Sequence, residues 1–205
     1  MSYQNDLKQI FSYIISLNVL KDSSLDIAKK IADKGHSTTR KDCLDILNHH
    51  KINDLKSFKE SSLKLALFYI KIALKDNSIS IEEINSVKFL KLLLDINEGD
   101  FVADVNQYNE VADIIKKQLE SMYADDNKID SNESLQKVHL QEMFGLNYDQ
   151  FLQIANDIEL NAIDRGAEYI DLDSFISSEA YNKWQKQNKP KTAKLDLSVS
   201  LKKNK

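Results

Sequence analysis

Glycine, proline and cysteine are scarce in this sequence of 205 residues. It holds four Gly, one Pro and one Cys, whereas average usage would give roughly fourteen Gly and ten Pro. β-Sandwiches, barrels and phosphate-binding loops need such residues at their turns, and neither GxGxxG nor GxxxxGK[ST] occurs. The single Cys43 excludes a disulfide framework and a thiolate zinc site. Helices joined by short polar turns remain, so we expect an all-α protein.

Long apolar runs are absent as well. The longest, LALFYI at 65–70, is far shorter than the roughly 20 residues that span a bilayer. The first ten residues, MSYQNDLKQI, lack the charged-then-apolar pattern of a signal peptide. A lone Cys also fits a reducing compartment. These features predict a cytoplasmic location.

Apolar residues recur at helical spacing along most of the chain. They predict helices near 4–18, 23–34, 39–50, 54–75, 81–94, 98–121, 131–143, 148–166 and 172–187. The segment Leu63–Leu74 is apolar nearly all round, which predicts a helix buried on most sides. We divide the chain into an N-terminal helical extension (1–51), a helical core (52–188) and a basic tail (189–205). In the tail, the alternation over 195–201 fits either one short strand or a disordered segment.

An internal repeat has an offset of fifty residues, so that 74–101 aligns with 124–151 without a gap. The identical pairs are Asp76/Asp126, Asn77/Asn127, Ile79/Ile129, Glu83/Glu133, Leu90/Leu140, Asn97/Asn147 and Phe101/Phe151. Most of these positions have a role at helix starts. Ser80 with Glu83, and Asp130 with Glu133, have the spacing of capping boxes.

A second pair of caps follows in each copy. Asn97-x-x-Asp100 and Asn147-x-x-Gln150 predict helix starts, with Ile96 and Leu146 placed to pack on Phe101 and Phe151. Each half is therefore expected to contain a helix, an acidic loop, a capped helix, a short turn and a further capped helix. Two such halves would pack together about a pseudo-twofold axis.

The repeat resembles the TerB-like domain of bacterial tellurite-resistance proteins. The matching pieces are IALKDNSISIEE at 72–83 and MYADDNKIDSNE at 122–133, with LLLDINEGDF and MFGLNYDQF closing the halves. The match covers about 52–180. Asn77 and Asn127 replace the Gly that often follows the loop Asp, and Asn tolerates the left-handed conformation. The resemblance implies a duplicated all-α core and a non-enzymatic interaction or scaffold module of stress response or phage defence. It also implies metal binding and assembly at the inner membrane face.

The two acidic loops place hard oxygen donors beside a helix start. The candidate ligands of a divalent cation are Asp76, Glu83, Asp125, Asp126, Asp130 and Glu133. Carboxylates suit Ca²⁺ best among the common ions. Neither loop is an EF-hand, because Ile129 would occupy a ligand position and Leu135 the position that needs Gly. The alternative is that these residues only cap helices and form turns.

Charge is distributed unevenly. Residues 61–180 hold nine Lys and one Arg against thirteen Asp and ten Glu, a net charge of −13, whereas 181–205 carry +7 and 1–51 carry +2. The acidic middle favours a protein partner with a basic surface and argues against nucleic acid. The lysines of the tail would allow peripheral contact with an anionic membrane. An immunity-type protein that neutralises a basic toxin would use the same acidic face, and is the alternative function.

A third function is suggested by the first 51 residues, which loosely resemble a helix-turn-helix. Gly35 would form the turn, and 38–41 (Thr-Thr-Arg-Lys) would begin a recognition helix. Lys30 stands where such motifs are usually apolar. A three-helix cap over Leu63–Leu74, with Gly35 ending a helix, explains the segment better.

Catalytic patterns are missing from the sequence. There is no HExxH motif, and the adjacent His49 and His50 would point about 100° apart on a helix. Cys43 and His49 would be separated by a rise of about 9 Å. His139 is expected to pack within an apolar stripe that includes Leu135, Val138 and Leu140. We expect no enzyme.

Overall fold

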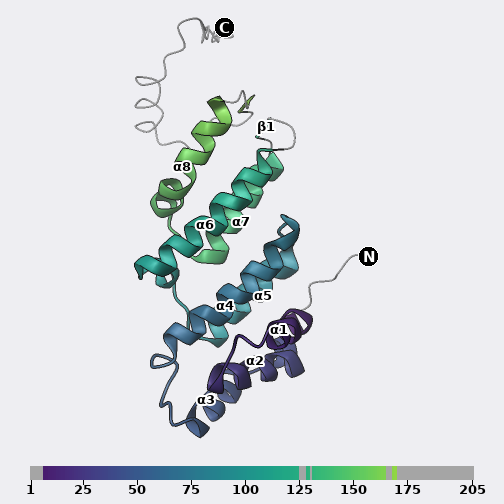
Figure 1. Ribbon diagram of the computed structural model, residues 1–205, viewed down its shortest axis with the longest axis vertical. Helices are drawn as coiled ribbons and strands as arrows, with labels where there is room; N and C mark the ends of the chain where they lie inside the picture. The colour runs from purple at the N-terminus through teal and green to yellow at the C-terminus, as the bar shows by residue number, and fades with distance from the viewer. Residues whose placement is uncertain (1–6, 125–127, 130, 165–167, 170–205) are drawn as a thin grey trace, which may run out of the picture. The chain divides into compact units, whose positions relative to one another are not determined.

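The computed structural model describes residues 7–124, 128–129, 131–164 and 168–169. Within these residues the fold is all-helical, as expected (Figure 1). The helices are α1 (Leu7–Ser16), α2 (Asp22–Lys34), α3 (Arg40–His49), α4 (Lys59–Ala73), α5 (Ile81–Leu93), α6 (Val105–Met122), α7 (Ser131–Phe144) and α8 (Tyr148–Asp164). Short 3₁₀ turns are η1 (Gly35–Ser37), η2 (Leu74–Asp76) and η3 (Asp100–Val102). Two-residue strands β1 (Lys128–Ile129) and β2 (Glu168–Tyr169) pair in parallel.

All of the described elements belong to the first unit of the chain, Met1–Phe175. Helices α1 to α3 of the predicted extension are therefore part of the same unit as α4 to α8. The helix predicted at 172–187 and the strand predicted at 195–201 lie outside the described residues.

The first two helices pack against α4, and α3 packs against α2. Helix α1 contacts α2 and α4, and α2 contacts α3 and α4 (Figure 1). At this contact the rings of Phe11 and Tyr69 are stacked, with centroids 6.1 Å apart, and both residues are fully buried. Gly35 ends α2 with a φ of 57°, as predicted. Seven of the α4 residues from Leu63 onwards are buried, which confirms the prediction of a helix buried on most sides.

Two predicted helix starts are wrong. Helix α4 begins at Lys59 rather than near 54, because the Asp54 carboxylate accepts the Ser57 amide at 2.7 Å and forms a turn there. The predicted helix 98–121 is interrupted, since α6 begins only at Val105. Asp104 caps α6 by accepting backbone amides of its first turn at 2.9 and 3.3 Å.

The turns that follow α5 and α7 match each other at an offset of fifty residues. Asp95 and Gly145 both adopt the left-handed conformation, with φ of 59° and 60°. The amides of Ile96 and Leu146 each bond to the carbonyl five residues earlier, at 2.8 and 3.0 Å. Both side chains are buried. The two turns therefore end their helices in the same way.

The predicted second caps are also present. The Asn97 amide donates to the Asp100 carboxylate at 2.6 Å, and the Asn147 amide donates to the Gln150 side chain at 3.0 Å. In the first copy this cap precedes η3 rather than a long helix. The difference arises because Asp104 provides a separate cap for α6.

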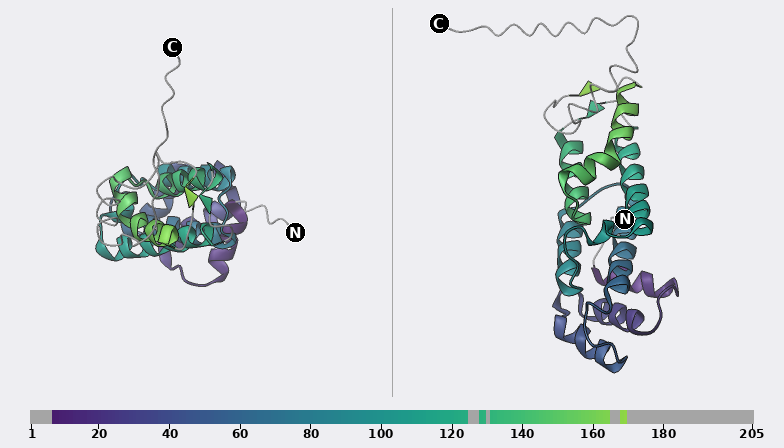
Figure 2. Two further views of the ribbon diagram at one scale, coloured as in Figure 1. Left: turned by 90° about the horizontal axis from the view of Figure 1, so that it is seen from above. Right: turned by 90° about the vertical axis from the view of Figure 1, so that its left-hand side faces the viewer.

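The two turns lie against each other. Helix α5 contacts α7 and α6 contacts α8 (Figure 2). The Gly99 amide donates to the Gly145 carbonyl at 3.0 Å. Phe101 and Phe144 pack edge to face, with centroids 5.9 Å apart and both side chains fully buried. Gly145 has a φ of 60°, a conformation that favours glycine.

Candidate functional site

The first acidic loop is organised by hydrogen bonds within the chain. Asp76 accepts the amide and the hydroxyl of Ser78 at 3.1 and 3.0 Å. Ser80 accepts the Glu83 amide at 3.2 Å, and Glu83 accepts the Ser80 amide at 2.8 Å. The predicted capping box is therefore confirmed. Glu83 is almost fully buried, so its carboxylate is already committed to the start of α5.

Helix α6 holds this loop from the other side. The Gln118 side-chain amide donates to the Leu74 carbonyl at 3.0 Å and to Asn77 Oδ1 at 3.3 Å. Asn77 has a φ of 58°, which agrees with the prediction that Asn would take the left-handed position. The loop is thus fixed by a buried side chain of a helix more than forty residues away.

The second acidic loop lies mostly outside the described residues. This applies to Asp125, Asp126 and Asp130, and to the side chain of Glu133. In the part of the chain that is described, no group of three or more His, Cys, Asp or Glu side chains is arranged to hold a metal ion. The predicted Ca²⁺ site therefore stays a prediction.

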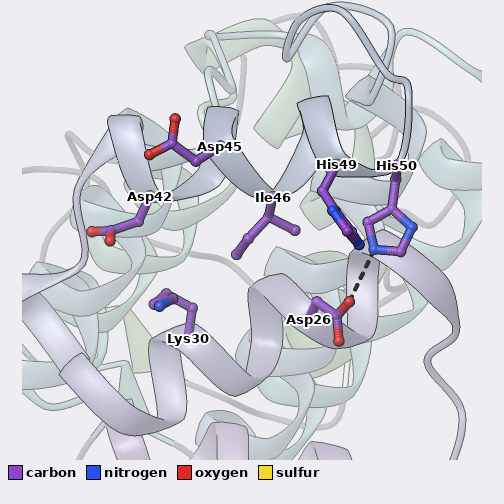
Figure 3. Close-up of a pocket in the computed structure, with 7 residues that line it drawn as sticks. All are labelled: Asp26, Lys30, Asp42, Asp45, Ile46, His49 and His50. Carbon is purple, nitrogen blue, oxygen red and sulfur yellow. Dashed lines mark hydrogen bonds and ion pairs between the residues drawn. The ribbon is translucent and has the colours of Figure 1, made fainter.

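A pocket of about 390 Å³ lies between α2 and α3 (Figure 3). It is lined by Asp26, Lys30, Asp42, Asp45, Ile46, His49 and His50. His50 Nε2 lies 2.9 Å from Asp26 Oδ2. The hydrogen bond with His50, together with one from Lys29, holds the pKa of Asp26 below its usual value.

Three of the six polar residues at the pocket, Asp26, Asp42 and His50, have hydrogen-bond or ion-pair partners in the chain. Asp42 pairs with Lys34 at 2.7 Å and accepts the Thr39 amide at 2.9 Å, and these contacts lower its pKa. Asp45 and His49 are exposed. The arrangement is a wide charged groove in which two carboxylates stabilise α2 and α3.

Cys43 is on α3 but is fully buried. Burial raises the pKa of its thiol to about 12, so the thiolate is scarce at neutral pH. A thiol in this state is a core residue rather than a nucleophile.

The residues of the predicted helix-turn-helix have structural partners. Thr38 is buried and donates to the Gly35 carbonyl at 2.8 Å. Thr39 caps α3, and Arg40 pairs with Asp95 at 3.0 Å. The Arg40–Asp95 pair joins α3 to the turn after α5. Together the three contacts engage three of the four side chains that base recognition would require.

Sequence analysis missed a buried ion pair in the second half. Lys137 Nζ lies 3.0 Å from Glu159 Oε1, and both side chains are fully buried. The Tyr123 hydroxyl donates to the same oxygen at 3.1 Å, and the ammonium lies 5.7 Å from the Tyr123 ring centroid. Lys137 precedes Leu140 and Phe144 by three and seven residues. That spacing places Lys137 on the buried face of α7, so the sequence pattern could have predicted its burial.

The apolar stripe predicted around His139 is wrong. Leu135 and Val138 are 51% and 45% exposed, whereas Leu140 is fully buried. The buried face of α7 runs through Lys137, Leu140 and Phe144 instead. His139 is only partly buried, at the edge of that face.

Comparison of the chain with known protein families, curated proteins and solved structures found no match. In the described residues, no helix is long and apolar enough to cross a membrane.

Proposed function

We propose that this chain is a non-enzymatic interaction module that binds a basic protein partner through exposed acids on α6 and α8. We define the α6–α8 acidic surface as Asp113, Glu120, Asp149 and Asp157. All four residues are exposed. The observation that carries the proposal is that α8 exposes Asp149 and Asp157 and has no Lys or Arg over Tyr148–Asp164.

The net negative charge of the surrounding residues adds to the negative potential of the α6–α8 acidic surface. Residues 61–180 carry a net charge of −13. Several lysines of the first unit are already paired, as in Lys71 with Glu110 and Lys88 with Glu142. A field of one sign raises the local concentration of an oppositely charged partner and speeds its association.

The proposal includes a TerB-like duplicated core. Its support is the pair of turns at Asp95 and Gly145, with equivalent backbone bonds and caps fifty residues apart. A duplicated scaffold of this kind presents α6 and α8 side by side.

Titration of the full chain with a ten-residue lysine peptide tests the proposal. The variant neutralises the acidic surface: Asp113→Asn, Glu120→Gln, Asp149→Asn and Asp157→Asn. The variant loses four weak surface ion pairs with the peptide, which together contribute on the order of 1.4 kcal/mol to the free energy of binding. Its affinity for the peptide should therefore fall about tenfold. It should also fall with added salt, because the Debye length shrinks from about 10 Å at 0.1 M to about 3 Å at 1 M.

The matched control removes four exposed acids elsewhere: Asp22→Asn, Asp33→Asn, Asp45→Asn and Glu60→Gln. It changes the net charge by the same amount and should lower affinity less than threefold. Equal losses in the two variants would show a general charge effect and would refute a defined acidic surface.

A further inference from the structure

The buried pair Lys137–Glu159 joins α7 to α8 inside the second half of the fold. Both charges are completely removed from solvent, and Tyr123, the residue that follows α6, donates a hydrogen bond to the same Glu159 oxygen. Three helices therefore meet at one carboxylate. Nothing in the proposed function uses this pair.

A buried ion pair stabilises a helix contact poorly. Removing two charges from water costs several kcal/mol per ion, and their mutual attraction roughly offsets this cost. When the helices separate, both groups regain hydration. Asn156 Oδ1 on α8 and Gln136 Oε1 on α7 are buried without a hydrogen-bond partner among the described residues. These two atoms would also gain hydration when the helices separate.

At two of the three equivalent positions the first half has buried apolar residues, whereas Asn109, which corresponds to Glu159, is exposed. At an offset of fifty residues, Lys137 corresponds to Val87 and Tyr123 corresponds to Ala73. Val87 and Ala73 are both fully buried. Separating apolar groups exposes them to water with no compensating hydration, so at these two positions opening costs more in the first half than in the second.

We infer that the Lys137–Glu159 pair is a latch that lets α8 detach from α6 and α7 while the rest of the unit stays folded. The buried pair fixes α8 in one position when closed, and its rehydration lowers the cost of opening. Detachment exposes Phe151, Ile154 and Ile158, which are buried in the closed state. Detachment would move Asp149 and Asp157 of the acidic surface together with α8, but the latch does not require that they bind a partner.

Hydrogen–deuterium exchange of the full chain, followed by mass spectrometry of its peptides, tests the latch. Amides of α8 should exchange at least tenfold faster than the slowest amides of α4. The reason is that detachment of α8 has a lower free energy than global unfolding and exposes only the α8 amides. The double variant Lys137→Met/Glu159→Leu replaces the pair by apolar side chains and should slow α8 exchange about tenfold. Exchange in α1–α4 should not change.

The control is Lys88→Met/Glu142→Leu, which makes the same replacement in an exposed pair of 2.7 Å between α5 and α7. It should leave α8 exchange unchanged. Tyr123→Phe removes one hydrogen bond and keeps the pair, so it should speed α8 exchange alone even if the double variant does not fold. Equal exchange of α8 and α4 in the unaltered chain would overturn the inference, as would a double variant or Tyr123→Phe without effect on α8.

Discussion

Glu83 illustrates how an acidic residue of this chain stabilises a helix start. Its carboxylate accepts the Ser80 amide at 2.8 Å, and the Ser80 hydroxyl accepts the Glu83 amide at 3.2 Å. Asp76 likewise accepts hydrogen bonds from Ser78. Of the carboxylates predicted to bind a cation, the two that are described in the structure thus hold the first loop and the start of α5.

Replacing Ser80 by Ala should lower the free energy of unfolding by about 1 kcal/mol, as loss of an N-cap usually does. The reason is that the Glu83 amide loses its acceptor at the first turn of α5. Urea denaturation followed by circular dichroism measures the change. The control Asn85→Ala, at an exposed position of the same helix, should stay within about 0.5 kcal/mol.

Glu83→Gln distinguishes a cap from a cation ligand. A Gln side chain keeps an oxygen that can accept the Ser80 amide, so stability should be nearly unchanged. If Glu83 binds Ca²⁺, calorimetric titration should instead show loss of binding in this variant. Unchanged Ca²⁺ binding, or none in either protein, supports the cap.

Asp100 is expected to make stability depend on pH in the acid range. Partial burial would raise its pKa, but hydrogen bonds from Lys59 Nζ at 2.7 Å and from the Asn97 amide at 2.6 Å hold the pKa below its usual value. In the unfolded chain an Asp titrates near about 3.9. The stabilisation is therefore complete above about pH 4, and it is lost as pH falls through the lower folded pKa.

The variant Asp100→Asn should lose this pH dependence. At pH 7 it should be destabilised by about 1–2 kcal/mol, because Lys59 loses a charged partner. The difference from the unaltered chain should shrink as pH falls from 4 to 2. Urea denaturation at several pH values measures both effects, and a constant difference across that range would contradict the assignment.

Helix α1 is an integral part of the core at the scale of elements. Phe11 of α1 stacks on Tyr69 of α4, and Leu7, Ile10 and Ile14 are also buried. The helix therefore covers the apolar surface of α4, as the sequence predicted for the first 51 residues.

Phe11→Ala should lower the free energy of unfolding by about 3–5 kcal/mol, the usual cost of such a cavity. Thermal denaturation of the full chain measures the loss. The exposed neighbour Gln9→Ala should change stability by less than about 0.5 kcal/mol. A Phe11→Ala protein that melts like the unaltered chain would show that α1 is dispensable for the fold.

The helices could be predicted where caps and periodicity agreed. Ser80 with Glu83 located the start of α5, and Gly35 located the end of α2. The start of α6 was missed because two caps compete there, and Asp104 rather than Asn97 begins the long helix.

The buried pair was missed for a different reason. A Lys on a helix usually faces solvent, so Lys137 was not considered as a core residue, although its spacing to Leu140 and Phe144 placed it on the buried face. Its partner Glu159 lies 22 residues away on another helix. Only tertiary packing brings the two charges together, and no local pattern predicts that.

Charge separates the described regions at the scale of the whole molecule. Residues 1–51 carry +2 and contain local ion pairs such as Lys34 with Asp42, whereas 61–180 carry −13. The sequence predicted this asymmetry directly. The position of the exposed acids on α6 and α8 required the structure.

The most direct test of the proposed function is to map the binding of a ten-residue lysine peptide by amide chemical-shift changes in the ¹⁵N-labelled full chain. We predict that the largest changes fall on α6 and α8, around Asp113, Glu120, Asp149 and Asp157, and diminish at high salt. Changes spread evenly over the molecule, or centred on the α2–α3 pocket, would contradict the acidic surface as the binding site.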